Sequence, residues 1–408
     1  MRISSSAIYE TNVSLLNQSQ SKLLHTQQQL ASGRRMLTPA DDPFASARAL
    51  EVSQSDSANT QFVTNRNTAK HSTVMAETIL NSVTSLLQDV RTATVGDGSG
   101  VLTTPDKNAL ATDLRGRLEE LVGLANSTDG IGNYLFSGYQ GKTQPFLKGS
   151  AGIQYMADDG QRLIQVDSSR QLATSDSGAD IFMRIKNGNG KFVVNGSPAN
   201  TGNSIFSQGA VTNPAWLTGH NYQIEFHVDI INGESTTSYD VLDLTTEELL
   251  SEGNSFSSGQ PINIDGMQFD ITGEPGDCDT CFITPSENES LFTTMSNLIS
   301  ALESSNSMGG DVAKSQYTNS VNRALNNIDR GLENVSTIRT SLGSRLRELD
   351  ALQMTGEDIG LQYKNKLSEL QDVDFNKAVS DLNQQQSSLT AAQKSFKQVS
   401  DLSLFNYL

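Results

Sequence analysis

Residues 376–400 read NKAVSDLNQQQSSLTAAQKSFKQVS and carry a helical heptad pattern. The repeating positions, spaced alternately by four and three residues, are Ala378, Leu382, Gln385, Leu389, Ala392, Phe396 and Val399. Near the other end of the chain, Leu16, Leu23 and Leu30 repeat every seven residues. Such a stripe lies on one face of a helix and must be covered by another helix. We therefore expect the two ends to pair with each other or with a neighbouring molecule, as in an assembly protein.

Further helices are predicted between these ends. Phe62, Ala69, Ala76, Val83 and Val90 recur every seven residues, and the pair Asp42-Pro43 predicts an N-cap and a first-turn proline upstream of them. Thr104-Pro105-Asp106 predicts another helix start, and helices are also expected over residues 287–302 and 311–354. The last of these has a heptad stripe that Arg339 interrupts, so Arg339 is expected to reach solvent or to pair.

The middle of the chain changes to the period of β-strands. Strands are predicted at residues 153–155, 162–166, 181–185, 192–194, 222–231, 238–244 and 262–271, and Asn-Gly turns separate several of them. We expect an α+β fold: an elongated antiparallel helical bundle or coiled coil built from both chain ends, with a β-rich domain inserted in the middle. The predicted domains are a terminal coiled coil (1–40 and 374–408), a helical rod (41–146 and 286–373) and an outward-facing β-rich insertion (147–285).

Charge excludes two classes of partner. The net charge is −17, which argues against a nucleic-acid surface and against an anionic membrane. Residues 145–290 hold 6 basic and 20 acidic side chains, a net of −14, which favours a solvated surface. The sequence contains no run of about twenty apolar residues, so no membrane-spanning helix is predicted. Met1 to Leu24 lacks the pattern of a cleavable signal peptide, so secretion by another route is expected.

Few residues suggest chemistry. His25, His71, His220 and His227 are scattered, and solvated histidines are a better interpretation than metal ligands. Cys278 and Cys281 form one Cys-x-x-Cys, but zinc would need two more ligands. A local disulfide is slightly favoured over two free thiols. No phosphate-binding loop, nucleophile elbow or catalytic triad pattern is present in the sequence, so we expect no catalytic residue, no metal and no cofactor.

Several short motifs resemble the flagellin superfamily. Residues 30–35 (LASGRR) and 39–43 (PADDP) resemble its N-terminal signature, and residues 372–375 (DVDF) resemble its pre-terminal motif. Residues 132–139 (GNYLFSGY) and 144–146 (QPF) are similar to the segment that closes the first helical half in its junction subunits. The ends, residues 1–4 (MRIS) and 405–408 (FNYL), resemble the junction subunits rather than flagellin itself.

This resemblance implies a structural subunit of the bacterial flagellum that joins hook to filament and has no enzyme activity. It implies assembly into a ring of about eleven copies, contacts with the first hook-associated junction protein and with flagellin or the filament cap, and type III export with a chaperone. The assembly residues would be Leu16, Leu23, Leu30, Leu382, Leu389, Phe396 and Val399. Two alternatives stay open: a flagellin-type filament subunit, or a secreted adhesin or hydrolase on a coiled-coil stalk.

Overall fold

The computed structural model describes residues 5–97, 103–150, 152–231, 234–304 and 310–401. Within these ranges the long helices are α1 (Ser5–Ser32), α2 (Pro43–Asp97), α3 (Thr104–Ala125), α4 (Leu291–Ser304), α5 (Asp311–Gln371) and α6 (Phe375–Asp401). The chain divides into two compact units, one of Met1–Arg66 with Ala351–Leu408 and the other of Asn67–Asp350. The three-domain division expected from the sequence stays a prediction. The resembling end motifs, residues 1–4 and 405–408, lie outside the described residues.

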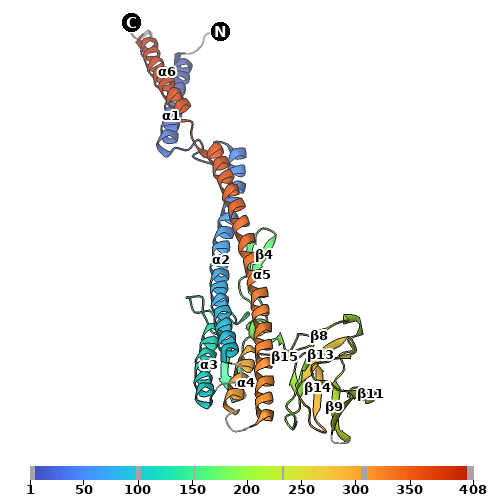
Figure 1. The fold of residues 1–408 in the computed structure, drawn as a ribbon. Helices are drawn as coiled ribbons and strands as arrows, with labels where there is room; N and C mark the ends of the chain where they lie inside the picture. Colours follow the sequence, from blue (N-terminus) through green and yellow to red (C-terminus); the bar gives the residue numbers. More distant parts are fainter. Residues whose placement is uncertain (1–4, 98–102, 151, 232–233, 305–309, 402–408) are drawn as a thin grey trace. The chain divides into compact units, whose positions relative to one another are not determined.

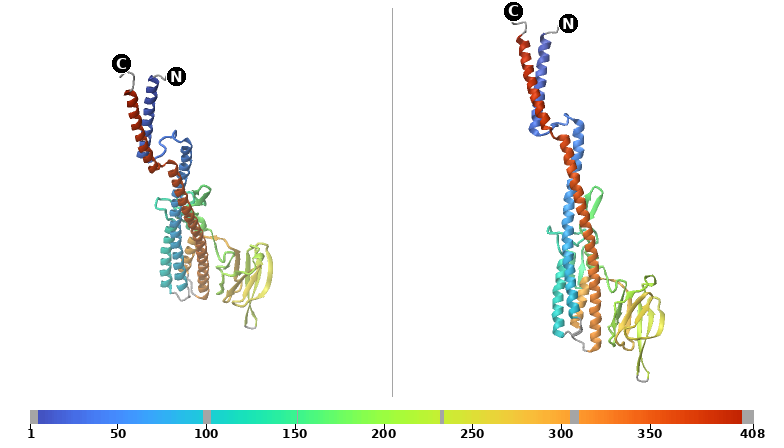
Figure 2. Two further views of the ribbon diagram at one scale, coloured as in Figure 1. Left: turned by 90° about the horizontal axis from the view of Figure 1, so that it is seen from above. Right: turned by 45° about the horizontal axis from the view of Figure 1, so that its top comes forward.

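The first unit brings helices from the two ends of the chain together. Helices α1 and α6 lie side by side in both figures that show the fold (Figures 1 and 2). Next to them, the first part of α2 contacts the last part of α5, where the side-chain amide of Asn59 donates to the Gly356 carbonyl at 2.8 Å. The expected α2 start is confirmed: α2 begins at Pro43, and the Asp42 carboxylate accepts from the Ala45 N–H at 3.0 Å.

In the second unit, the heptads make a helical core. Val321, Ile328, Val335, Leu342 and Leu349, each seven residues apart on α5, are all buried. The first four of them belong to the hydrophobic core that α5 shares with α2, α3 and α4, and the four helices run alongside one another in Figure 1. Arg339 does not stay in the stripe as an unpaired cation, because its guanidinium pairs with Glu77 of α2 at 2.8 Å.

Short strands close the helical core of this unit. They form three two-stranded pairs: β1 (Phe146–Gly149) with β2 (Gly152–Tyr155), β3 (Leu163–Asp167) with β4 (Arg170–Ala173), and β5 (Ile185–Lys186) with β15 (Asn288–Glu289). Phe146 and Phe182 come from this region and pack on Phe292 of α4, with ring centroids 5.1 and 5.9 Å away. Part of the sequence expected to lie in the β insertion therefore belongs to the helical core.

The remaining strands form two sheets around a separate core. The first is antiparallel with the order β11 (Glu248–Ser255), β10 (Glu234–Asp243), β9 (Tyr222–Ile231), β14 (Thr280–Pro285) and β6 (Phe192–Gly196). The second has the order β12 (Pro261–Ile264), β13 (Met267–Thr272) and β7 (Ile205–Phe206), and β8 (Ala210–Val211) also pairs with β13. A short helical turn, η2 (Pro214–Trp216), follows β8. Tyr222, Phe226, Phe269 and Ile283 are buried in the shared core, as expected for two sheets packed face to face.

Two strand predictions are wrong. Residues 181–185 are mostly a π-helical turn, η1 (Ala179–Met183), because Asn334 of α5 donates to the carbonyls of Asp180 and Ile181 at 2.9 and 3.0 Å. The single strand predicted over 262–271 is the hairpin of β12 and β13. Its turn is Asp265-Gly266, whose positive φ angles of 42° and 79° fit the Asp-Gly hairpin signal.

Candidate assembly surface

Helices α1 and α6 bring most of the expected assembly residues to one seam. Leu16, Leu23, Leu30, Leu382, Leu389 and Phe396 are all half-buried there, and Ala378 is buried. The seam is closed at one end by the rings of Tyr9 and Phe396, whose centroids are 5.3 Å apart. The side chain of Val399 lies outside the described residues. In this structure the two ends of one chain therefore pair with each other.

The seam is thin and leaves apolar surface uncovered. Exposed large hydrophobic side chains on the same two helices include Tyr9, Leu15, Leu24, Phe375 and Val379. Inside the seam, the side-chain oxygen of Gln385 is buried without a hydrogen-bond partner, which weakens the pairing. Two helices that cover each other only partly still have an apolar edge to bury. This edge is the geometry expected of a surface that packs against further subunits.

Backbone hydrogen bonds close the chain at the base of this pair. The Arg35 N–H donates to the Gln371 carbonyl at 2.7 Å, and the Val373 N–H donates to the Gly33 carbonyl at 2.9 Å. The loop between α1 and α2 is stabilised by Asp41, whose carboxylate accepts from the N–H groups of Leu37 and Thr38, each at 2.8 Å. These backbone donors lower the pKa of the Asp41 carboxyl. Both signature segments, residues 30–43 and 372–375, thus meet at one junction.

A second polar junction explains the motif at residues 132–139. Leu135 and Phe136 of this segment are buried in the helical core, and the Tyr155 hydroxyl donates to the Phe136 carbonyl at 3.1 Å. The Asp158 carboxylate accepts from the N–H groups of Tyr139 and Gln140 at 2.9 and 2.8 Å. Burial alone would raise the pKa of Asp158, but backbone donors from Tyr139, Gly160 and Gln140 lower it.

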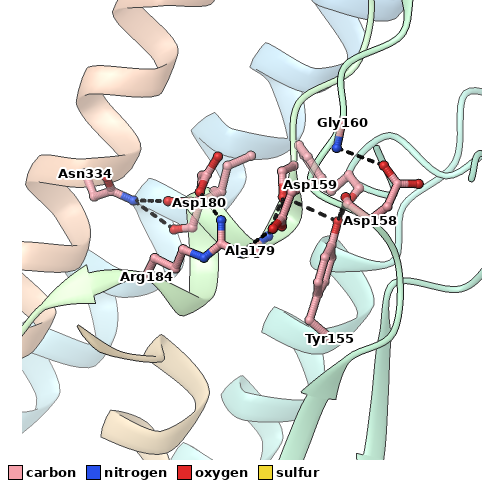
Figure 3. A network of polar contacts seen from close by, with 11 residues as sticks. Tyr155, Asp158, Asp159, Gly160, Ala179, Asp180, Arg184 and Asn334 are labelled. Atoms are coloured by element: carbon pink, nitrogen blue, oxygen red, sulfur yellow. Dashed lines mark hydrogen bonds and ion pairs between the residues drawn. The ribbon is translucent and has the colours of Figure 1, made fainter. Parts of the chain in front are cut away.

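The same junction reaches the long helix α5. Figure 3 shows Arg184 between the carboxylates of Asp159 and Asp180, and Asn334 against the turn that contains Asp180. Nearby, Arg345 of α5 makes two hydrogen bonds to the Asp176 carboxylate, each 2.8 Å long, and both side chains are mostly buried. The sequence did not reveal this network, because its partners are far apart in the chain and follow no periodic pattern. The one sequence signal that pointed to this network is a glycine-rich motif beside a cluster of acidic residues.

The residues considered for chemistry are not gathered into a site. His220 pairs with Asp243 at 2.6 Å and His227 with Asp240 at 3.0 Å, so these two histidines are paired rather than simply solvated. Cys278 and Cys281 are not bonded to each other in this structure, where Cys281 is buried in the sheet core and Cys278 is exposed, and the expected disulfide stays a prediction. Among the described residues, no group of three or more His, Cys, Asp or Glu side chains could hold a metal ion. None of the described helices is long and apolar enough to cross a membrane.

Part of the chain matches a known family model. A family model described as the bacterial flagellin N-terminal helical region matches residues 3–141. The first third of the chain is therefore similar to the N-terminal helical region of bacterial flagellin.

More specific relatives match nearly the whole chain. Flagellar hook-associated protein 3 of Salmonella typhimurium is 28% identical over 405 residues, 99% of both chains. A crystal structure of flagellar hook-associated protein-3 from Legionella pneumophila has a TM-score of 0.74 at 28% identity and covers 78% of this chain and 98% of that one. A structure of the flagellar junction protein FlgL from the same organism has a TM-score of 0.70 at 28% identity, with 80% and 100% covered. The chain is thus related along its length to flagellar hook-associated protein 3.

Proposed function

We propose that this chain is a structural subunit of the flagellum that joins the hook to the filament. The observation that carries the proposal is the full-length relation to hook-associated protein 3, combined with terminal helices that pair and keep an apolar edge exposed. The subunit assembles with other flagellar components. Its finer partners, as proposed here, are further copies of itself in a ring, the first hook-associated junction protein and flagellin or the filament cap.

The terminal helices are the proposed assembly elements. Half-buried Leu16, Leu23, Leu382 and Leu389 offer little burial within one chain, so packing against neighbouring subunits would add most of the apolar contact. Weak pairing also suits a chain that is exported unfolded, because an isolated helix pair with a glutamine-rich seam is marginal in water. We propose export by the flagellar type III route, with a chaperone that holds the C-terminal region before export, and no enzyme activity.

Electron microscopy of a strain that lacks this chain tests the proposal. We expect hooks without filaments, and filament protein shed into the medium. Expression of the wild-type chain from a plasmid should restore filaments, which controls for effects on neighbouring genes. Intact, attached filaments in the deletion strain would contradict a junction role. Loss of the filament subunit itself from cells and medium would instead favour the flagellin alternative.

A further inference from the structure

A groove of about 280 Å³ lies in the first unit, between the loop after α1 and the first turns of α2. Its lining is mixed, and its apolar part comes from Met36 and Leu37 of the loop and from Leu50 of α2. Leu50 is 62% exposed, so much of its side chain is open to a partner. The loop is held in place by the Asp41 carboxylate, which accepts from the Leu37 N–H at 2.8 Å. The groove is therefore formed before any partner binds.

Arg34 gives this groove a positive charge. It lines the groove and is exposed, and no carboxylate of the described residues forms an ion pair with it. Its neighbour Arg35 pairs with Asp42 at 3.4 Å, and Arg48 pairs with Glu51 at 2.9 Å. Unlike these two, Arg34 is left to meet a carboxylate that comes from outside the chain.

A ridge with the opposite charge lies on α5 in the same unit. Met354 and Leu361 are 68% and 60% exposed, and Asp358 lies four residues after the first and three before the second. This spacing puts the three side chains, which we call the α5 ridge, on one face of the helix. Asp358 is exposed and forms no ion pair with any described residue. Phe375 and Val379 of α6 are also exposed, but they have no acidic residue between them.

The groove and the α5 ridge face opposite ways. Asn59 of α2 donates to the Gly356 carbonyl at 2.8 Å, which marks the side where the two helices meet. A helix turns by about 100° per residue, so Met354 and Asp358, each two residues from Gly356, point away from α2. Leu50 precedes Asn59 by nine residues, about two and a half turns, and so points away from α5. One chain therefore cannot place its own ridge in its own groove.

We propose that the groove of one copy receives the α5 ridge of a second copy of this chain. Arg34 of the first copy would pair with Asp358 of the second, and Leu50 would pack against Leu361. The charge pair fixes the register, and the apolar side chains leave water. Because the two surfaces differ, each copy can bind one neighbour through its groove and another through its ridge. Such a head-to-tail contact repeats from copy to copy and can close into a ring.

This inference rests on the proposed function, because a junction subunit must contact further copies of itself. It assigns one such contact to α2 and α5, in addition to the terminal helices α1 and α6.

Disulfide cross-linking in flagella tests the contact. A strain whose chain carries Leu50→Cys together with Leu361→Cys is treated with copper phenanthroline, and its flagella are run on non-reducing gels. We expect dimers and larger multimers that a reductant separates, and the wild-type chain controls for the thiols of Cys278 and Cys281. Val95→Cys with Leu361→Cys is the matched control, because Val95 is also exposed on α2 but lies about 65 Å further along it. This control should give no multimers.

Charge exchange tests the ion pair. Arg34→Asp and Asp358→Arg each place like charges against each other, so either change alone should leave most cells without attached filaments. The double variant restores an opposite pair and should regain filaments, which a role of either side chain within its own copy would not produce. Glu333→Arg, at an exposed position of α5 in the second unit, should leave filaments attached.

Three outcomes would overturn the contact. They are no multimers from Leu50→Cys with Leu361→Cys in flagella that keep their filaments, equal multimers from the Val95→Cys control, or a double charge variant no better than the single ones. The first outcome would leave the junction role intact. Filaments that persist in the deletion strain would instead contradict the junction role, and multimers would still support the contact between copies.

Discussion

Tyr9 of α1 and Phe396 of α6, from opposite ends of the chain, pack ring against ring at 5.3 Å between centroids. Yet Tyr9 is still 56% exposed, so this contact covers only one side of the ring. An aromatic pair contributes on the order of 0.5–1.5 kcal/mol beyond its burial. The terminal helices therefore depend on each other, and their pairing alone gives them little stability.

We expect both ends to be unfolded or readily opened in the isolated monomer. Helices α1 and α6 bury few side chains fully, and most of the stability of helices in proteins comes from such packing. Limited proteolysis in dilute solution should trim both ends and leave a core of roughly residues 45 to 370. Full protection of the peptide bonds around Leu16 and Leu389 under these conditions would contradict the prediction.

Leu389→Asp should prevent assembly without unfolding the rest of the chain. The substitution puts a carboxylate in the middle of the seam, and burying it unpaired in the assembled state is strongly unfavourable. We expect unchanged thermal melting of residues 67–350, together with non-motile cells that carry no attached filament. Gln393→Asp, at an exposed position on the same helix, is the control and should leave motility intact. A motile Leu389→Asp strain with stable filaments would rule out a role for this seam in assembly.

Gly138→Ala should destabilise the second unit by about 1–3 kcal/mol, measured as a lower melting temperature. Gly138 has φ of 63°, and a Cβ there would collide with the Asp158 carbonyl oxygen. Gly123→Ala is a control within the same unit, because Gly123 lies inside α3 with open space around it. That change should be neutral or stabilise the helix by up to ~1 kcal/mol. Equal effects of the two substitutions would show that the tight turn at Gly138 is unimportant.

The two-sheet module should be removable between Lys191 and Ser286. The Ser286 N–H donates to the Lys191 carbonyl at 2.9 Å, so the flanks of the module already touch. Replacing residues 192–285 with two glycines should keep cooperative melting and raise the fractional helicity seen by circular dichroism. Replacing residues 148–282 instead should abolish cooperative melting, because it also removes Phe182 and Ile185 from the helical core. Loss of folding in the smaller deletion would show that the sheets stabilise the helices.

Acid should weaken the sheet module through Asp243. Burial opposes ionisation of Asp243, but hydrogen bonds from His220, Thr245 and Thr246 outweigh it and lower its pKa to about 2. A carboxyl with a depressed folded-state pKa stabilises the fold above its unfolded-state value of 3.8, and that stability is lost as pH falls toward 2. The urea midpoint, followed by Trp216 fluorescence, should fall over this range.

Asp243→Asn should have a lower midpoint at pH 6 and a flatter dependence below pH 4. Asp229→Asn, at an exposed position on the neighbouring strand β9, should behave as the wild type does. An Asp243→Asn curve parallel to the wild-type curve would show that this carboxyl does not carry the acid sensitivity.

The periodic part of the fold was predictable from the sequence. Val321, Ile328 and Val335 recur every seven residues and are buried as that spacing requires, and the Asp42-Pro43 pair starts α2. Helix α5 was predicted to end near Met354 and instead reaches Gln371, and Gly356, two residues past the predicted end, continues the helix instead of capping it.

Features that depend on distant partners could not be predicted. Strand β11 has little apolar alternation, and its pairing with β10 defines it. The turn at Ala179–Met183 looks like a strand in sequence, and Asn334 on α5 holds it in a helical conformation. Among the candidate residues, the α1 and α6 stripes were visible as heptads. The hydrogen-bonding roles of Asp158 and Asp176 were not visible in the sequence, because isolated acidic residues in a loop follow no periodic pattern.

The backbone bonds between Arg35 and Gln371, and between Gly33 and Val373, fix when each part of the chain can fold. A chain that emerges N-terminus first, from a ribosome or an export channel, presents α1 long before its partner α6 exists. Residues 67–350 hold their own core and can fold in the interval, whereas the first helix must wait for the last one. Contacts between such distant segments form slowly because a long loop must close first. The junction between the two ends therefore forms only after the whole chain has emerged, because it needs residues from both ends.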